Sequence, residues 1–169
     1  MTGVATSDLW DERGEDLVSL AVQFQDVGGR VRFEGSVRTV LCRGDNQLVK
    51  EAAARPGHGC VLVVDGGGAL DSALMGGNIA AAAARNGWAG AVIHGAVRDR
   101  AEIGALDFGV KAMGSNPRKS RKDGAGAVDV PVEIGGVAIT PGAHLWADED
   151  GIVIDPAAAR AEQEGEGEA

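Results

Sequence analysis

The sequence predicts a single α/β domain, with a mixed sheet in the middle of the chain and mostly β-structure in the C-terminal third. A chain of 169 residues, 44% of them hydrophobic, is long enough for one buried core and too short for two ordinary domains. Three Phe, three Trp and no Tyr leave the core to Val, Ile, Leu and Ala, and 27 glycines allow many tight turns. In the middle of the chain, apolar runs of strand length alternate with short helical patterns, which is typical of α/β folds.

The N-terminal region contains two segments with different patterns. Residues 5–22 mix Leu, Val and Trp with several acids, which is typical of a short helix or of an extended entry segment. Residues 31–42 are rich in β-branched side chains and predict strand structure. Because Gly35 interrupts this run, we expect two strand segments there.

Strands and helices alternate along the middle of the chain. The continuous apolar run at residues 60–64 predicts a central strand buried on both faces. Residues 91–94 predict the next buried strand, and residues 110–113 predict another strand. Residues that can cap a helix precede two of the helical patterns, Asp45 or Asn46 before the first and Asn78 before the second. The predicted helices cover residues 47–54, 79–85 and 98–106.

Beyond Pro117 the pattern becomes rich in β-structure. Residues 128–134 and 137–139 flank Gly135-Gly136 and predict a hairpin with a two-glycine turn, and residues 152–154 predict a last strand. We expect the single domain to span residues 1–156. Residues 157–169 carry Glu, Gly and Gln without large apolar side chains, so we expect a disordered acidic tail.

The charge of the chain argues against broad nucleic-acid binding. Sixteen basic and 25 acidic residues give a net charge of −9, to which the tail contributes several acids. The basic cluster at residues 118–122 is short, lies among Asn, Pro, Asp and Gly, and lacks interleaved aromatic residues. A solvated loop is therefore favoured over an RNA site.

The sequence shows no signal for a membrane or for an oxidising compartment. No apolar stretch approaches the roughly 20 residues of a membrane span, and the acidic N-terminus does not resemble a signal peptide. Cys42 and Cys60 are too few and too far apart for a zinc motif and predict two buried free thiols. We expect a cytoplasmic protein without a membrane partner.

The stretch Gly76-Gly77-Asn78-Ile79 predicts a backbone site for an anion. A ligand can approach the two glycines closely, and the N–H groups at the start of the following helix point outward. Carboxylates bind at such helix starts. A simple turn with a helix cap explains the same four residues, and both interpretations stay open.

Arg98, Asp99 and Glu102 follow a buried strand, at a strand-to-helix junction where open α/β sheets usually place ligands. Arg98 offers a planar fork that matches a carboxylate with two hydrogen bonds. Asp99 and Glu102 are three residues apart, share a helix face and offer two hard oxygen ligands for Mg²⁺ or Mn²⁺. Acids in a first helical turn also stabilise the helix dipole, which is the alternative explanation.

Together these groups predict a site for a 2-oxo acid. A cation held by Asp99, beside an acid bound by Arg98, would act as a Lewis acid and stabilise the enolate left when the C3–C4 bond of the substrate breaks. Retro-aldol cleavage and β-decarboxylation both pass through the pyruvate enolate. One site is therefore expected to serve both reactions.

Other polar residues give less specific signals. Asp65-Gly66-Gly67-Gly68 follows a strand, yet it matches neither the dinucleotide fingerprint nor a P-loop. His94 is a candidate base, although a hydrogen-bonded structural histidine is favoured. His58 and His144 lie beside glycines in expected loops. A solvated turn is the default for the acids around the last strand, which are Asp148, Glu149, Asp150 and Asp155.

Five short motifs stand out in order along residues 5–156: Val63-Val64-Asp65-Gly66-Gly67-Gly68, Met75-Gly76-Gly77-Asn78-Ile79, His94-Gly95-Ala96-Val97-Arg98-Asp99, Gly114-Ser115-Asn116-Pro117 and Asp148-Glu149-Asp150-Gly151. In these motifs the chain resembles the RraA family (regulator of ribonuclease activity A), which includes the class II 4-hydroxy-4-methyl-2-oxoglutarate aldolases. The resemblance implies a layered β/β/α domain, similar to a swivelling phosphohistidine domain, assembled as a homotrimer with sites at subunit boundaries.

The resemblance also implies residue roles. Gly76, Gly77, Asn78 and Ile79 would form the substrate loop, Arg98 the carboxylate clamp, and Asp99 a metal ligand. Aldolases of the family tend to have Asp at the position of Gly77, whereas another branch has glycine there and an acid three residues after Asp99, as Glu102 is here. We therefore expect Asp99 and Glu102 to hold Mg²⁺ or Mn²⁺.

The resemblance leaves two functions open. The first is a metal-dependent lyase that cleaves 4-hydroxy-4-methyl-2-oxoglutarate to two pyruvates and decarboxylates oxaloacetate. Aldolases of the family often extend past the last strand with helices, whereas this chain ends in a short tail, so decarboxylation is favoured over the aldol step. The alternative is a regulator that binds and inhibits RNase E. A methyltransferase label found on some relatives has no support here, since a methyl-donor fingerprint is missing.

Overall fold

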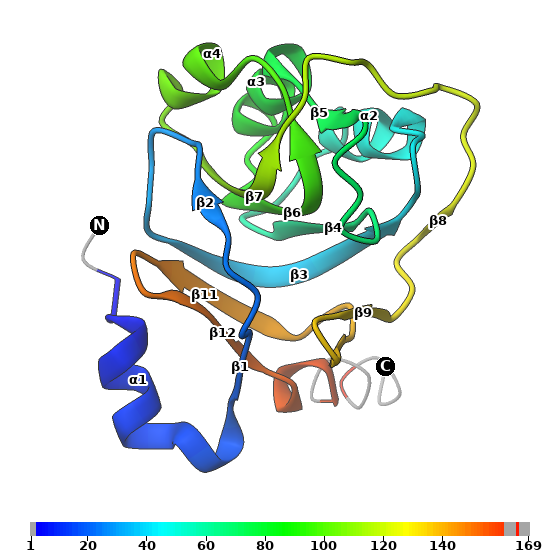
Figure 1. The fold of residues 1–169 in the computed structure, drawn as a ribbon. Coiled ribbons are helices and arrows are strands. Elements are labelled where there is room, and N and C mark those ends of the chain that lie inside the picture. Colours follow the sequence, from blue (N-terminus) through cyan, green and yellow to red (C-terminus); the bar gives the residue numbers. More distant parts are fainter. Residues whose placement is uncertain (1–2, 161–164, 166–169) are drawn as a thin grey trace.

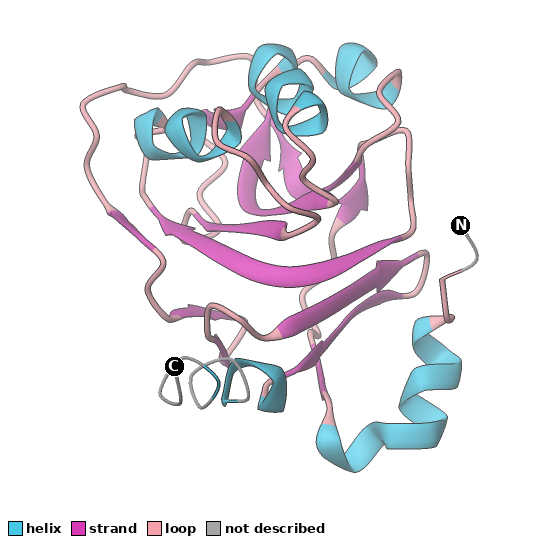
Figure 2. Cartoon of the chain, turned by 180° about the vertical axis from the view of Figure 1, so that it is seen from behind, coloured by secondary structure: helices cyan, strands magenta, loops and turns pink. Residues whose placement is uncertain are grey.

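The computed structural model describes residues 3–160 and residue 165, and it confirms the predicted α/β class. Three short helices cover one face of a parallel sheet, and an antiparallel layer lies against the other face (Figure 1). Figure 2 shows the same layers from behind, with the N-terminal helix on the far side of the antiparallel strands. The covering helices are α2 (Gln47–Ala53), α3 (Gly77–Arg85) and α4 (Arg100–Gly104).

The long strand β3 (Phe33–Leu41) joins the two strand layers. Its second half pairs in parallel with β4, and its first half pairs antiparallel with β11. The parallel layer continues in the order β3-β4-β6-β7, through β4 (Val61–Asp65), β6 (Gly90–Val97) and β7 (Gly109–Ser115). Three short strands add to it: β2 (Gln25–Asp26) pairs with β7, β8 (Ala127–Val128) with β3, and β5 (Ala73–Met75) with β6.

The antiparallel layer combines strands from the N-terminal and C-terminal parts of the chain. Strand β12 pairs with β11 on one side and with β1 on the other. Helix α1 precedes β1, so residues 5–22 contain both of the states expected for them. A separate hairpin turns at Gly135-Gly136, as predicted. The elements are α1 (Thr6–Arg13), the 3₁₀ turn η1 (Gly14–Asp16), β1 (Val18–Ser19), β9 (Val132–Ile134), β10 (Val137–Ile139), β11 (His144–Asp148) and β12 (Gly151–Asp155).

Two apolar cores separate the three layers. Helices α2 and α3 pack on one core with alternate residues of the parallel strands, and the other core lies between the two sheets. All five residues of β4 are buried, as predicted for a central strand. Cys42 belongs to the first core, where burial raises the pKa of its thiol to about 12, and Cys60 is partly buried.

The predicted break at Gly35 is wrong, because this residue lies inside the continuous strand β3. Gly35 pairs with Leu145 of β11, and a Cβ there would collide with the carbonyl oxygen of Gly59. The glycine therefore marks a close approach of two backbones and not a turn.

Strand β11 was missed, and its two terminal residues correct two expectations. His144 is in a strand, and its Nε2 lies 2.8 Å from Glu34 Oε2. Asp148 is 3% exposed, and its carboxylate accepts both the N–H and the hydroxyl of Thr6, each at 2.7 Å. Asp148 is therefore not in a solvated turn as expected: its buried carboxylate fixes the start of α1 through two hydrogen bonds.

The C-terminal boundary lies at the edge of the described residues. Ala159 is buried in the core between the sheets, so packing continues beyond residue 156. Residues 161–164 and 166–169 of the predicted tail lie outside the described residues. No helix in residues 3–160 is long and apolar enough to cross a membrane.

The Phe33 ring packs where a side chain at Gly90 or Gly109 would have to go, since a Cβ at either glycine would collide with the ring. We predict that Gly90→Ala and Gly109→Ala each lower the free energy of unfolding by about 1–3 kcal/mol, the usual cost of overpacking. Urea denaturation measures the free energy of unfolding of each variant. Gly104→Ala is the control, because the nearest atom to a Cβ there is 3.5 Å away. Equal effects in all three variants would contradict the role of Phe33.

Candidate functional site

The candidate site lies at the carboxyl ends of two paired strands. Met75 ends β5, Val97 ends β6, and the two residues are partners in the parallel pairing. The N–H of Arg98 donates to the Met75 carbonyl oxygen at 3.0 Å. Strand β6 is longer than the predicted 91–94, so Arg98 follows it at once. The segments starting at Gly76 and Arg98 therefore meet, although they are distant in the sequence.

Gly76 and Gly77 form the start of α3. Gly76 is the N-cap, and its carbonyl accepts the N–H of Ala80 at 3.0 Å. Asn78 lies inside the first turn, so the prediction that it caps the helix is wrong. The N–H groups of Asn78 and Ile79 have no acceptor in the part of the chain that the structure describes. Such open N–H groups at a helix start attract anions.

Asp99 closes this turn from the other side. Its Oδ2 accepts the N–H of Gly77 at 2.9 Å, so one of the N–H groups expected for a ligand instead orients a carboxylate. Asp99 has φ 61°, in the left-handed region that Asp tolerates better than most residues. A Cβ on Gly76 would lie 2.9 Å from the same oxygen. Glycine at this position therefore allows the close approach of Asp99.

Glu102 reaches the same turn from α4. A Cβ added to Gly77 would collide with the Glu102 carboxylate. This carboxylate thus occupies the space that a side chain at Gly77 would fill. The structure brings both predicted acids, Asp99 and Glu102, against the Gly76-Gly77 backbone.

The two carboxylates suit a hard divalent cation. Mg²⁺ is usually held by one or two carboxylates and completes its shell with water and substrate oxygens. Residues 3–160 contain no group of three or more His, Cys, Asp or Glu placed to hold a metal ion. The donor set therefore fits a cation that shares its shell with a ligand, and differs from the four-ligand set of a structural zinc site.

Arg98 lies along Gly76 and is half-buried. Its Nε would be 3.4 Å from a Cβ on Gly76, and its Nη1 donates a long bond of 3.4 Å to the Pro117 carbonyl. Among the described residues no ion pair involves Arg98. The guanidinium is therefore available to an anion in the adjoining cavity.

That cavity measures about 210 Å³ and is strongly cationic. The predicted residues Gly76, Asn78, Ile79, Arg98 and Asp99 line it, whereas Gly77, which is buried, and Glu102, which is exposed, do not. The sequence analysis missed the other lining residues, which are Asn46, Lys50, Ala73, Lys119 and Lys122. Four cations and one carboxylate thus face a single small space.

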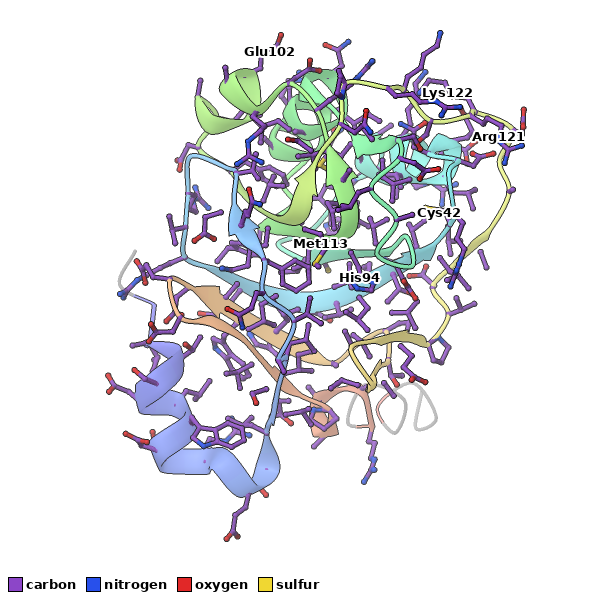
Figure 3. The ribbon with its side chains drawn as sticks, viewed as in Figure 1. Cys42, His94, Glu102, Met113, Arg121 and Lys122 are labelled. Atoms are coloured by element: carbon purple, nitrogen blue, oxygen red, sulfur yellow. The ribbon has the colours of Figure 1, made fainter. Side chains whose placement is uncertain are left out.

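Two of these lysines come from the basic cluster that was predicted to be a solvated loop. We call residues 118–125 the cationic strap; Figure 3 shows Arg121 and Lys122 on it. The strap is fixed to β5, since Ala73 N–H donates to the Arg118 carbonyl at 2.8 Å and the buried Ser120 hydroxyl donates to the Ala73 carbonyl at 2.7 Å. Its cations are therefore held beside the cavity.

The charges of the cavity act on one another. Burial lowers the pKa of Lys122, and the nearby charges of Lys50, Arg98 and Lys119 lower it further. Its Nζ donates to Asn46 Oδ1 at 3.0 Å. The density of Lys and Arg in residues 118–122 was the available signal for this site, but the return of that loop to β5 depends on tertiary contacts.

The other candidates from the sequence lie elsewhere. His94 Nδ1 is 3.4 Å from Asp65 Oδ1, which also accepts the Gly67 N–H, so a structural pair is observed there. A larger cavity of about 400 Å³ is lined by Phe33 and Glu34 at the start of β3 and by Trp146 of β11. Its arginines, Arg30 and Arg32, form ion pairs with Asp107 and Glu149. The cationic cavity is therefore the better anion site.

Comparison with known proteins identifies the family of this chain. The RraA-like family (Aldolase/RraA) matches residues 6–154. A protein of Alkalilimnicola ehrlichii named "Putative 4-hydroxy-4-methyl-2-oxoglutarate aldolase" is 51% identical over 151 residues, which cover 89% of this chain and 94% of that protein.

Two solved structures are similar along almost their whole length. One is the RNA-processing inhibitor RraA from Thermus thermophilis, with 46% identity, a TM-score of 0.88, and coverage of 92% of this chain and 94% of that one. The other, from Geobacillus kaustophilus HTA426, is described as an S-adenosylmethionine: 2-dimethylmenaquinone methyltransferase, with 46% identity, a TM-score of 0.88, and coverage of 90% and 94%. The chain therefore belongs to the RraA-like family.

Proposed function

We propose that the protein is a divalent-metal-dependent lyase that decarboxylates oxaloacetate and cleaves 4-hydroxy-4-methyl-2-oxoglutarate to two pyruvates. The observation that carries this proposal is the meeting of Arg98 and Asp99 with the start of α3, in a cavity that contains three further cations. The relative that is 51% identical is named "Putative 4-hydroxy-4-methyl-2-oxoglutarate aldolase", which also supports the proposal.

Each end of the substrate has a partner in the cavity. The carboxylate beside the ketone would bind the Arg98 guanidinium and the open N–H groups of Asn78 and Ile79. Both proposed substrates carry a second carboxylate, and the lysines of the cavity, Lys50, Lys119 and Lys122, supply its counter-charge. The surplus of positive charge favours dianionic over monoanionic 2-oxo acids.

Asp99 and Glu102 are the residues that would hold the cation, Mg²⁺ or Mn²⁺. When bound there, such a cation supplies Lewis acidity toward the negative charge that develops on the ketone oxygen as the C3–C4 bond breaks. The bond from Gly77 N–H keeps the Asp99 carboxylate at the cavity wall, and Arg98 keeps the acid in register with it.

A second candidate function is a regulator that binds RNase E. It is favoured by the similarity to the Thermus RraA structure, which is described as that of an RNA-processing inhibitor. The exposed face of α1 and η1 offers a surface for a basic partner, with the acids Asp8, Asp11, Glu12, Glu15 and Asp16. Such binding would be sensitive to salt and indifferent to a chelator.

The lyase proposal predicts metal-dependent release of pyruvate from both substrates. Asp99→Ala is expected to abolish turnover, because a metal ligand is lost. Arg98→Ala is expected to weaken 2-oxo acid binding about 10- to 150-fold, since a hydrogen bond to a charged group contributes about 1.5–3 kcal/mol. The assay follows pyruvate with Mg²⁺ or Mn²⁺ and then with EDTA.

The same assay separates the two functions. Arg13→Ala, which breaks only the ion pair with Asp155 far from the cavity, is the matched control and should keep turnover. Full activity in both site variants would show that the site is wrongly assigned. No turnover above that of the free metal, together with a salt-sensitive complex with RNase E, would favour the regulator.

A second prediction concerns the exchange between Gly77 and Glu102. Glu102→Ala should weaken Mn²⁺ binding, and Gly77→Asp in that variant should restore it, because the new carboxylate enters the space that Glu102 leaves. Isothermal titration with Mn²⁺ measures both effects. Gly77→Ala with Glu102→Ala is the control for space without charge. Restoration by Ala as well as Asp would refute the shared role.

A third prediction concerns pH. Because the pKa of Lys122 is lowered in the folded protein, this side chain loses its proton before an ordinary lysine does. The affinity for succinate, a four-carbon dianion, should therefore fall as pH rises through that lowered value, which lies below 10.5. Lys122→Met should bind succinate more weakly at neutral pH and lack this step. Parallel pH profiles for the two proteins would contradict the prediction.

A further inference from the structure

The cationic strap has a second attachment, opposite to β5, at the residues that precede α2. The N–H of Asn46 donates to the Arg121 carbonyl and the N–H of Arg121 donates to the Gly44 carbonyl, each at 2.9 Å. Lys122 is held between these bonds by Asn46 Oδ1. The strap thus crosses from β5 to α2 and borders the cavity on the way.

Asp45 is the centre of this second attachment. It is 2% exposed, and its carboxylate accepts four backbone N–H groups. Oδ1 accepts from Gln47 at 3.1 Å and Gly124 at 3.2 Å, and Oδ2 accepts from Asp123 at 2.9 Å and Ala125 at 3.3 Å. Three of the four donors belong to the strap.

A role in capping α2 alone does not explain this arrangement. Only the bond from Gln47 serves the helix start, whereas the other three close the strap around the carboxylate. Burial by itself would raise the pKa of Asp45, but the four N–H bonds outweigh it and hold that pKa below its ordinary value. The group is therefore charged at neutral pH and serves as an anion for the strap.

Asp45 is also outside the wall of the cavity, unlike its neighbour Asn46. We propose that Asp45 is a positioning residue for the distal carboxylate of the substrate: it fixes the cationic strap so that Lys119 and Lys122 face the cavity. This inference rests on the anion site of the proposed function and adds the residue that builds its cationic side. The repulsion among the cations is the force that the attachment resists.

A double-mutant cycle on ligand affinity tests the assignment. The ligands are succinate and butyrate, which have the same chain length and differ by the distal carboxylate. Asp45→Asn keeps the size but places an NH₂ group, or one uncharged oxygen, against N–H donors of the strap. We expect Asp45→Asn to weaken the binding of succinate about tenfold or more and the binding of butyrate less than twofold.

The cycle is completed with Lys119→Ala/Lys122→Ala. This double variant should weaken succinate binding at least as much as Asp45→Asn does. Adding Asp45→Asn to the double variant should change the dissociation constant for succinate less than twofold. Asp8→Asn, on the exposed face of α1, is the matched control. The assignment is overturned if Asp45→Asn weakens both ligands equally, if its effect adds fully to that of the lysine variant, or if the wild type does not prefer succinate.

Two further readouts keep the outcome unambiguous. Hydrogen exchange of the Asp123, Gly124 and Ala125 amides in the wild type should be slow, and exchange at the rate of an open loop would overturn the proposal even where Asp45→Asn fails to fold. The titration with succinate measures binding and does not require the protein to turn over a substrate. Asp45-dependent succinate binding in a protein that leaves oxaloacetate intact would refute the lyase and keep the positioning role.

Discussion

The site depends on the pairing of β5 with β6, because this contact makes Met75 and Val97 neighbours. Each strand leads straight into one half of the site, the glycine turn after Met75 and the Arg98-Asp99 pair after Val97. The pairing is irregular, since its register shifts between Ala73 and Met75, and the β6–β7 pairing shifts between Ile93 and Ala96. Such irregularities re-aim the residues that follow, and a slip of one residue would turn Arg98 to the other face.

The charge distribution follows from this geometry. The chain carries a net charge of −9, yet four cations and one carboxylate line one cavity of about 210 Å³. Lys50, Lys119 and Lys122 lie beside Arg98, and their mutual repulsion opposes folding. Burial lowers the pKa of Lys122 most, and the charges of Lys50, Arg98 and Lys119 lower it further. An anionic ligand would relieve that repulsion, which is the electrostatic basis of the proposed dianion site.

The sequence predicted the parts of the site that are local and missed those that are not. The glycine turn, Arg98, Asp99 and Glu102 each follow a recognisable strand or begin a helix, so their positions followed from the pattern of apolar runs. Lys119 and Lys122 lie in a loop that is fixed to β5 by the Ala73–Arg118 backbone bond and by the buried hydroxyl of Ser120. No periodicity records such a contact.

The same distinction explains the errors in the fold. Gly35 had the pattern of a break because a glycine usually interrupts a strand, but here it permits the close approach of Gly59. Asp148 had the pattern of a solvated turn, since its buried partner, Thr6, lies at the other end of the chain. The central strand β4 was predictable because burial on both faces leaves a continuous apolar run.

The glycines of the site constrain its chemistry as strongly as its charged groups do. Gly76 admits Asp99, and Gly77 admits Glu102, so each missing side chain is matched by one carboxylate of α4 or its cap. Asp99 has a left-handed backbone, and its side chain accepts the N–H of Gly77. A branch of the family that places its acid on the glycine turn and one that places it on α4 would therefore fill the same space with the same charge.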